Sequence, residues 1–158
     1  MKNIFWVLIG IVVVSAIVGV FALGYIQSIE KPVSSGVPTP TIKINYSNFA
    51  SEISKNSMIK ALPKNEKVLL KLYNFNSGER AFEKRYYLSA TNIEETNDEN
   101  AEVIVLMSSK YMDELTNKNL CSVFKKANNN GDLGIESSIS MASLAWKFKS
   151  MMKYKDCF

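Results

Sequence analysis

The chain has 158 residues, 47% of them hydrophobic, a formal net charge of +4 at pH 7 and no histidine. Without histidine, Ser-His and Cys-His catalysis, histidine-ligated metals and the usual proton shuttle near neutral pH are excluded. The positive charge does not indicate nucleic-acid binding, because Arg80 and Arg85 are the only arginines and the lysine excess lies in the last segment. We therefore expect a protein that is not an enzyme and uses no metal or cofactor.

Residues 1–30 are interpreted as a membrane anchor. After Lys2, no ionisable side chain appears until Glu30, and residues 4–26 are almost all apolar. A helix of that length spans about 34 Å, enough for the hydrocarbon core of a bilayer. A cleaved signal peptide is the alternative, with its cleavage site at Ala22-Leu23-Gly24. We expect a single-pass membrane protein. The positive charges before and after the span are nearly balanced and do not assign the soluble domain to one side of the membrane; we lean slightly to the extracytoplasmic side.

Residues 31–44 hold three of the four prolines and are interpreted as an extended linker. The folded domain is expected over 45–158. It should begin with a helix that presents Phe49 and Ile53 on one face and ends before Pro63.

Two strands are predicted next, over 67–75 and 80–90, joined by a turn. On the second strand, Phe82, Tyr86 and Leu88 are expected to share one face. The polar, acidic stretch 91–100 is interpreted as a solvated connection.

The stretch 101–139 changes its periodicity three times. Residues 101–107 form an apolar, β-branched run, typical of a strand buried on both faces. Two helices are predicted after it, and residues 132–139 then alternate as a strand with one face in water does. The first helix should present Tyr111, Met112 and Leu115 on one side, and the second should present Leu120, Val123, Phe124 and Ala127.

The last segment, from Ser140, predicts an amphipathic helix. Its apolar stripe consists of Met141, Leu144, Ala145, Phe148, Met151 and Met152. Lys149 and Lys153 flank the stripe on one side and Lys147 on the other, where they could contact anionic lipid headgroups. Trp146 and Tyr154 point away from the stripe. The stripe would either pack into the core or line a deformable apolar cavity, and both readings stay open.

The order strand, helix, helix, strand and final helix resembles the C-terminal half of a sterol carrier protein-type lipid-transfer domain. The resemblance is carried by Ala101-Glu102, Leu106-Met107-Ser108, Tyr111-Met112 with Leu115, Phe124 to Ala127, Gly131-Asp132-Leu133-Gly134-Ile135 and Met141-Ala142-Ser143-Leu144. Ser137-Ser138 departs from the family, which usually has a second glycine there. The fold expected is α+β, a mostly antiparallel sheet of four or five strands with helices packed on one face.

The two cysteines, Cys121 and Cys157, have two readings. In an exported domain they would form a disulfide that contributes about 4 kcal/mol in the chain-entropy model. In a cytoplasmic domain, Cys121 would be a small core residue and Cys157 an exposed thiol. We favour the disulfide.

The function expected is membrane-tethered, non-catalytic binding of a lipid or another apolar small molecule between sheet and helices. The expected lining is Leu106, Tyr111, Met112, Leu115, Phe124, Leu144, Phe148 and Met151, and a filled core is the alternative for the same residues. A membrane-anchored protein–protein interaction domain, with Trp146 and Tyr154 as contacts, is the second hypothesis. A pilin-like assembly subunit is disfavoured, because the prolines of 31–44 would break the long helix of such subunits.

Overall fold

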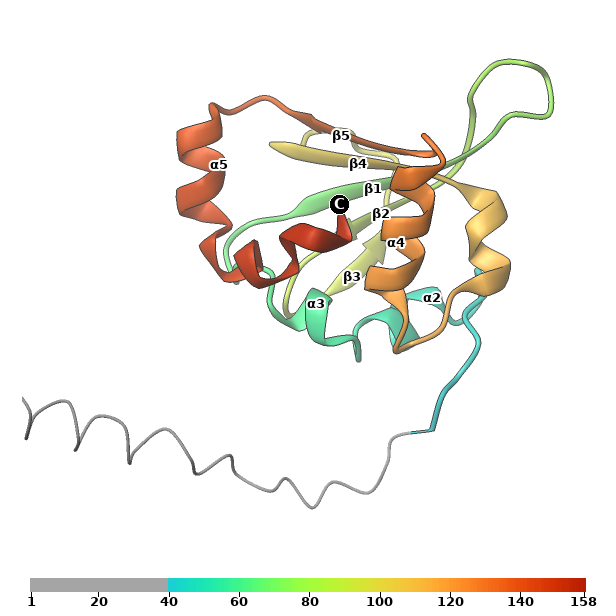
Figure 1. The fold of residues 1–158 in the computed structure, drawn as a ribbon, viewed down its shortest axis with the longest axis horizontal. Helices are drawn as coiled ribbons and strands as arrows, with labels where there is room; N and C mark the ends of the chain where they lie inside the picture. Colours follow the sequence, from blue (N-terminus) through green and yellow to red (C-terminus); the bar gives the residue numbers. More distant parts are fainter. Residues whose placement is uncertain (1–39) are drawn as a thin grey trace, which may run out of the picture. The chain divides into compact units, whose positions relative to one another are not determined.

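A mixed five-stranded sheet lies at the centre of the computed structural model, which describes residues 40–158 (Figure 1). The strands are β1 Val68–Asn74, β2 Ala81–Leu88, β3 Ile93–Glu95, β4 Val103–Ser108 and β5 Leu133–Ser137, arranged in the order β3-β2-β1-β4-β5. All neighbours are antiparallel except the central pair, β1 and β4, which are parallel. The predicted α+β class with a mostly antiparallel sheet is confirmed.

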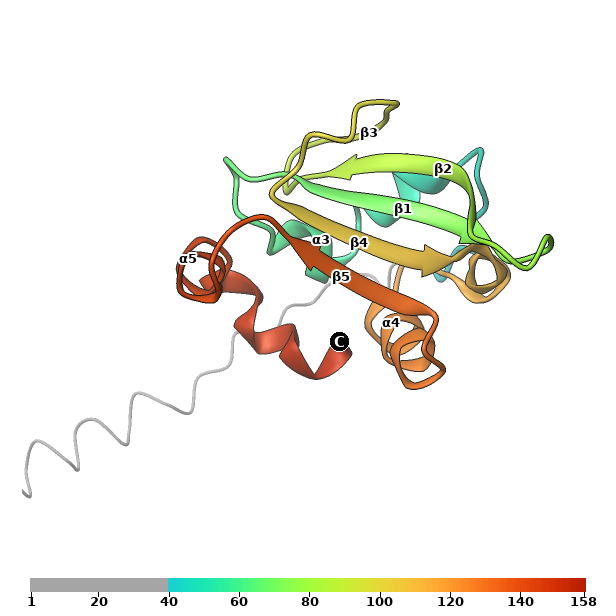
Figure 2. The same ribbon diagram turned by 90° about the horizontal axis from the view of Figure 1, so that it is seen from above.

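Six helical segments accompany the sheet within residues 40–158. They are α2 Phe49–Ile53, α3 Ser57–Lys60, the 3₁₀ helix η1 Ser109–Glu114, α4 Leu120–Asn129, α5 Met141–Lys147 and the 3₁₀ helix η2 Lys149–Cys157. Figure 2 shows α3, α4 and α5 on the same side of the sheet. The order β4, η1, α4, β5, α5 is the order predicted for 101–147.

The expected membrane anchor over 1–30, and most of the expected linker, lie outside the described residues. Within residues 40–158, none of the helices combines the length and the apolar character needed to cross a bilayer. The compact unit begins at Pro40, so that residues 40–44 belong to it. Ile44 is buried, and its backbone N–H donates to the carbonyl of Leu115 at 2.8 Å.

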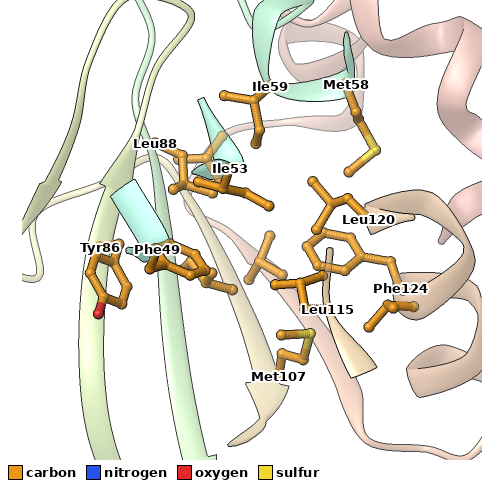
Figure 3. Close-up of a cluster of buried hydrophobic side chains, with 14 of the residues drawn as sticks. Phe49, Ile53, Met58, Ile59, Tyr86, Leu88, Met107, Leu115, Leu120 and Phe124 are labelled. Atoms are coloured by element: carbon orange, nitrogen blue, oxygen red, sulfur yellow. The ribbon is translucent and has the colours of Figure 1, made fainter. Parts of the chain in front are cut away.

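The core lies between one face of the sheet and the helices. Val68, Leu70 and Leu72 of β1 point to this face, and the parallel register places residues 103, 105 and 107 of β4 beside them. Figure 3 shows Phe49 of α2 against Tyr86 of β2, with ring centroids 4.3 Å apart. Each large apolar side chain buried here contributes roughly 1.5–3 kcal/mol.

The helix α4 forms as its sequence predicts. All four apolar residues of its predicted face are buried. Gly131, just after the helix, has φ 73, a left-handed conformation that glycine adopts without steric cost and that commonly ends helices.

Phe82 was expected on the same face as Tyr86, and this prediction is wrong. A β-bulge opposite Leu72 and Tyr73 adds one residue to β2, so that Tyr73 pairs with Phe82 while Leu72 pairs with Lys84. One extra residue turns the side chains before it to the other face. Phe82 therefore meets the edge of the Tyr73 ring on the face away from the helices, with ring centroids 6.4 Å apart.

The acidic stretch 91–100 is not wholly a solvated connection. It contains the short edge strand β3, in which Ile93 pairs with Leu88 and is buried. Three residues are too few for an alternation that could be recognised in the sequence.

The last segment is not one continuous helix. The chain leaves helical geometry at Phe148 (φ −102°, ψ 25°), and η2 follows α5 in a new direction (Figure 1). Trp146 is 76% exposed, as predicted, but Tyr154 packs against the core instead of pointing away from it. The single apolar stripe predicted for a straight helix is thus divided between two segments.

Candidate functional site: an apolar groove between sheet and helices

An apolar cavity of about 380 Å³ lies on the helix-covered side of the sheet. The sheet, α3, α4, α5 and η2 all contribute to it. The lining is Met58, Ile59, Leu62, Val68, Leu88, Val103, Val105, Phe124, Ile135, Met141, Leu144, Ala145, Phe148, Met151, Met152, Lys155 and Phe158. Lys155 is the one charged residue in this set. We call this cavity the groove.

The floor of the groove comes from the alternation of the strands. Val68, Val103 and Val105 lie on the helix-side face because every second residue of a strand faces the same way. On the same face of β5, Ile135 is 49% exposed, so the helices do not fully cover this edge of the sheet. The groove is the part of the sheet face that the helices do not cover.

Four methionines line the groove: Met58, Met141, Met151 and Met152. An unbranched thioether side chain has three rotatable bonds and adapts to irregular shapes. The walls can therefore adjust to ligands of different outline more readily than walls of β-branched residues could.

An ion-pair cluster and a disulfide hold the two ends of the wall formed by α5 and η2. None of the residues of α5 is buried. At one end, Lys147 Nζ contacts a carboxylate oxygen of Glu102 at 2.6 Å and one of Glu66 at 3.3 Å, and the hydrogen bond to Glu102 raises the pKa of Lys147. At the other end, the predicted disulfide between Cys121 and Cys157 is present and ties η2 to α4.

The mouth of the groove is defined by residues that both line it and face solvent: Ile135, Met141, Ala145, Met152 and Lys155. Met141 is 78% exposed and Met152 is 56% exposed. A ligand inside the groove would leave through this rim, and a polar end of that ligand would reach Lys155 there.

Four of the eight residues expected to line a ligand site do line the groove: Phe124, Leu144, Phe148 and Met151. Tyr111, Met112 and Leu115 belong to the packed core and do not line the groove. Leu106 lies on the opposite face of the sheet, over Gly134 of β5. A strand buried on both faces does not reveal from its sequence which parity faces the helices.

Sequence reasoning missed the contributions of α3 and of the strands. The sequence predicts a helix that ends before Pro63 and strands over 67–75 and 101–107, but none of their residues except Leu106 is among those expected to line a site. Val103 and Val105 share the orientation of the buried Met107, but that burial is seen only in the structure, so no sequence signal could have selected them.

The three lysines expected at a membrane surface have different surroundings. Lys147 is engaged by two carboxylates. Lys149 Nζ lies 5.2 Å from the centroid of the Trp146 ring, and Lys153 Nζ lies 5.1 Å from that of Tyr154. Two of the three are therefore not neutralised by an acidic partner in the described part of the chain.

A polar cluster at the turn between α4 and β5 has a structural role. The Tyr111 hydroxyl donates to Asp132 Oδ2 at 2.8 Å and accepts from Asn130 Nδ2 at 2.8 Å. Burial raises the pKa of Asp132, but the hydrogen bonds from Lys110 and Tyr111 outweigh it and lower the pKa overall. Asp132 is thus a stable anion that holds the turn. Within residues 40–158, no group of three acidic or cysteine side chains could hold a metal ion.

No protein-family model matches the chain, and a comparison with curated proteins likewise gives no match. Among solved structures, the chain is similar to a protein described as "UbiJ-SCP2 Ubiquinone synthesis protein". The similarity has 8% sequence identity and a TM-score of 0.33, and it covers 64% of this chain and 76% of that one. At this TM-score the likeness supports no conclusion about fold or function. The functional proposal below therefore depends on the groove.

Proposed function

We propose that the domain binds a lipid or another apolar small molecule in the groove, without catalysis. The observation that carries the proposal is an open cavity of about 380 Å³ whose lining is apolar except for Lys155. Small-molecule sites in proteins typically have volumes of about 300–1,000 Å³ and mostly hydrophobic walls. The sequence resemblance to a sterol carrier protein-type domain, and the element order from β4 to α5, support the same class of ligand.

The driving force would be the removal of apolar ligand surface from water. Each methylene group that enters the groove contributes about 0.8 kcal/mol, which corresponds to about a fourfold tighter dissociation constant. We therefore expect affinity to rise with the chain length of an alkyl ligand until the groove is full, and then to level off. The chain length at which it levels off measures the usable length of the groove.

The test uses two alanines of α5. Ala145 lines the groove and Ala142 does not, although both are exposed. In Ala145→Trp the indole would occupy the groove and weaken the binding of a fluorescent fatty acid or an apolar dye at least tenfold. Ala142→Trp, a matched control on the same helix, should bind as the wild type does. Equal binding by both variants, with unchanged melting temperatures, would contradict the proposal.

A membrane anchor in residues 1–30 and an extracytoplasmic location of the domain are part of this proposal. The disulfide supports the location, because such bonds persist in oxidising compartments. Resistance of the protein to alkaline extraction of membranes, and accessibility of the domain to protease added from the extracytoplasmic side, are the expected results. Release of the protein from membranes at alkaline pH would contradict the proposed anchor.

A further inference from the structure

We propose that the mouth of the groove docks on the surface of an anionic lipid bilayer. The surface concerned, here called the mouth surface, comprises Met141, Trp146, Met152, Lys149, Lys153 and Lys155. The exposure and charge of these residues carry the inference, which holds whether or not the groove takes the proposed ligand.

The apolar part of the mouth surface is unusually exposed. Met141, Trp146 and Met152 are 78%, 76% and 56% exposed, and all three lie within α5 and η2. These segments expose large apolar side chains although the domain has a well-packed core elsewhere. A concentration of exposed apolar side chains indicates a contact with a partner or a membrane.

The charged part of the mouth surface has one sign. Lys149, Lys153 and Lys155 form no ion pair within residues 40–158, whereas Lys147 is paired with Glu102 and Glu66. Asp156 is the only acidic residue from 140 onward. The sequence predicts Lys147, Lys149 and Lys153 at a membrane surface. In the structure Lys147 is paired with carboxylates, and the proposed surface contains Lys155 in its place.

The helix α5 turns its mouth side and its exposed tryptophan away from the protein body. Met141 and Ala145 lie at the rim, and Trp146 is 100° further around the helix. Lys147, a further 100° around, points back to the carboxylates of the domain. The side chain of Lys149 lies over the Trp146 ring, so the indole and the ammonium group share one patch.

This chemistry fits a bilayer better than a protein partner. Tryptophan is favoured at the interface between headgroups and acyl chains, and lysine can bury its stem there while its ammonium stays in water. Each lysine near an anionic surface strengthens binding by about fivefold. Met141, Met152 and Lys155 belong to both the mouth surface and the rim, so docking would join the groove directly to the acyl-chain region.

The experiment uses the full chain, in which Trp6 and Trp146 are the only tryptophans. Trp6→Phe leaves Trp146 as the single reporter. The protein is reconstituted into phosphatidylcholine vesicles with and without about one third phosphatidylglycerol, which carries the negative charge. Brominated acyl chains serve as quenchers. Residues 1–30 are the same in both vesicles, so anchoring cannot produce a difference between them.

The expected result is a blue-shifted, quenched Trp146 emission in anionic vesicles only, reversed by high salt. Replacing Lys149, Lys153 and Lys155 with glutamine should abolish the quenching. The matched control replaces Lys60, Lys64 and Lys118, which are exposed and form no ion pair within 40–158, and should leave it unchanged.

Four outcomes would overturn the inference: no quenching in either vesicle, equal quenching in both, loss of quenching in the control variant, or protection of Trp146 from acrylamide that depends on protein density and not on lipid. The last outcome would identify a second copy of the chain, or another protein, as the occupant. Binding of the apolar probe by the Ala145 and Ala142 variants is measured separately, so that failure of docking and failure of ligand binding are distinguishable.

Discussion

Cys157 of η2 and Cys121 of α4 are joined by a disulfide, with their Cα atoms 4.9 Å apart and a separation of 36 positions in sequence. Beside this bond, the ring of Phe158 meets the edge of the Phe124 ring at a centroid distance of 5.6 Å. Both phenylalanines line the groove. The covalent bond therefore fixes the η2 end of this wall, whereas α5, at the other end, buries no residue of its own.

The first prediction concerns this disulfide. Replacing Cys121 and Cys157 together with alanine should lower the free energy of unfolding by about 4 kcal/mol, because the unfolded chain regains the entropy of an open loop. Binding of an apolar probe should weaken as well, since the wall formed by η2 is released. Urea unfolding and probe titration measure the two effects. Reduction of the wild-type protein should reproduce both, and an unchanged unfolding midpoint after reduction would disprove the prediction.

The second prediction concerns the ion pair at the other end of the wall. Lys147 and Glu102 are 34% and 40% exposed, so solvent screens their attraction. A double-mutant cycle with Lys147→Gln and Glu102→Gln should give a small coupling that decreases with salt. Glu136→Gln, an exposed substitution on β5, is the control and should show no coupling with Lys147→Gln. A coupling of several kcal/mol, insensitive to salt, would show that the pair is desolvated in solution.

The third prediction separates the packed core from the groove. Leu115 is fully buried beside Met107, and Leu115→Ala should destabilise the domain by about 2–5 kcal/mol. Met152 lines the groove but is 56% exposed, so Met152→Ala should leave stability within about 0.5 kcal/mol and change probe affinity instead. Thermal unfolding and probe titration of both variants check this. Loss of stability in Met152→Ala equal to that in Leu115→Ala would show that the groove closes in solution.

The fourth prediction concerns Tyr46 at alkaline pH. Burial, together with the hydrogen bond that its hydroxyl donates to Glu83 Oε2 at 2.8 Å, raises the pKa of Tyr46 to about 12. In the unfolded chain the pKa of tyrosine is about 10. The stabilising effect of this difference is therefore complete below about pH 10 and is lost as the pH rises towards 12.

In ultraviolet titration of the folded protein, Tyr46 should ionise near pH 12. Burial also raises the pKa values of Tyr86, Tyr87 and Tyr111, so these tyrosines should ionise above their usual range as well. Glu83→Gln should lower the pKa of Tyr46, because the negative charge that opposes phenolate formation is gone. The same variant should flatten the loss of stability above pH 10. A pKa of Tyr46 that does not respond to this substitution would mean that the hydrogen bond is absent in solution.

Elements whose residues contact near neighbours in sequence could be predicted from sequence. The face of α4 is an example: Leu120, Val123, Phe124 and Ala127 recur at helical spacing and are all buried. The strands predicted over 67–75 and 80–90 are likewise present, as β1 and β2. In contrast, the single extra residue in β2 reversed the orientation of Phe82, because register depends on the partner strand and not on the strand's own pattern.

The candidate site was only half predictable for a related reason. Phe124, Leu144, Phe148 and Met151 lie on apolar helix faces, which periodicity identifies. Leu106 and Val105 are adjacent residues of a strand buried on both faces, and nothing local distinguishes the one over Gly134 from the one that lines the groove. Met58 and Ile59 belong to α3, far in sequence from Val103 and Val105 of the floor, and reach the groove only through packing.

The sequence by itself determined which residues are apolar, their periods along each segment, and the absence of histidine chemistry. Whether Cys121 meets Cys157, which face of β4 receives the helices, and whether a space remains between them were decided only by the tertiary structure. A cavity is the difference between the space enclosed by distant segments and the volume of the side chains that enter it. The sequence of one segment does not specify this volume, because it depends on how α3, α4, α5 and η2 pack together on the sheet.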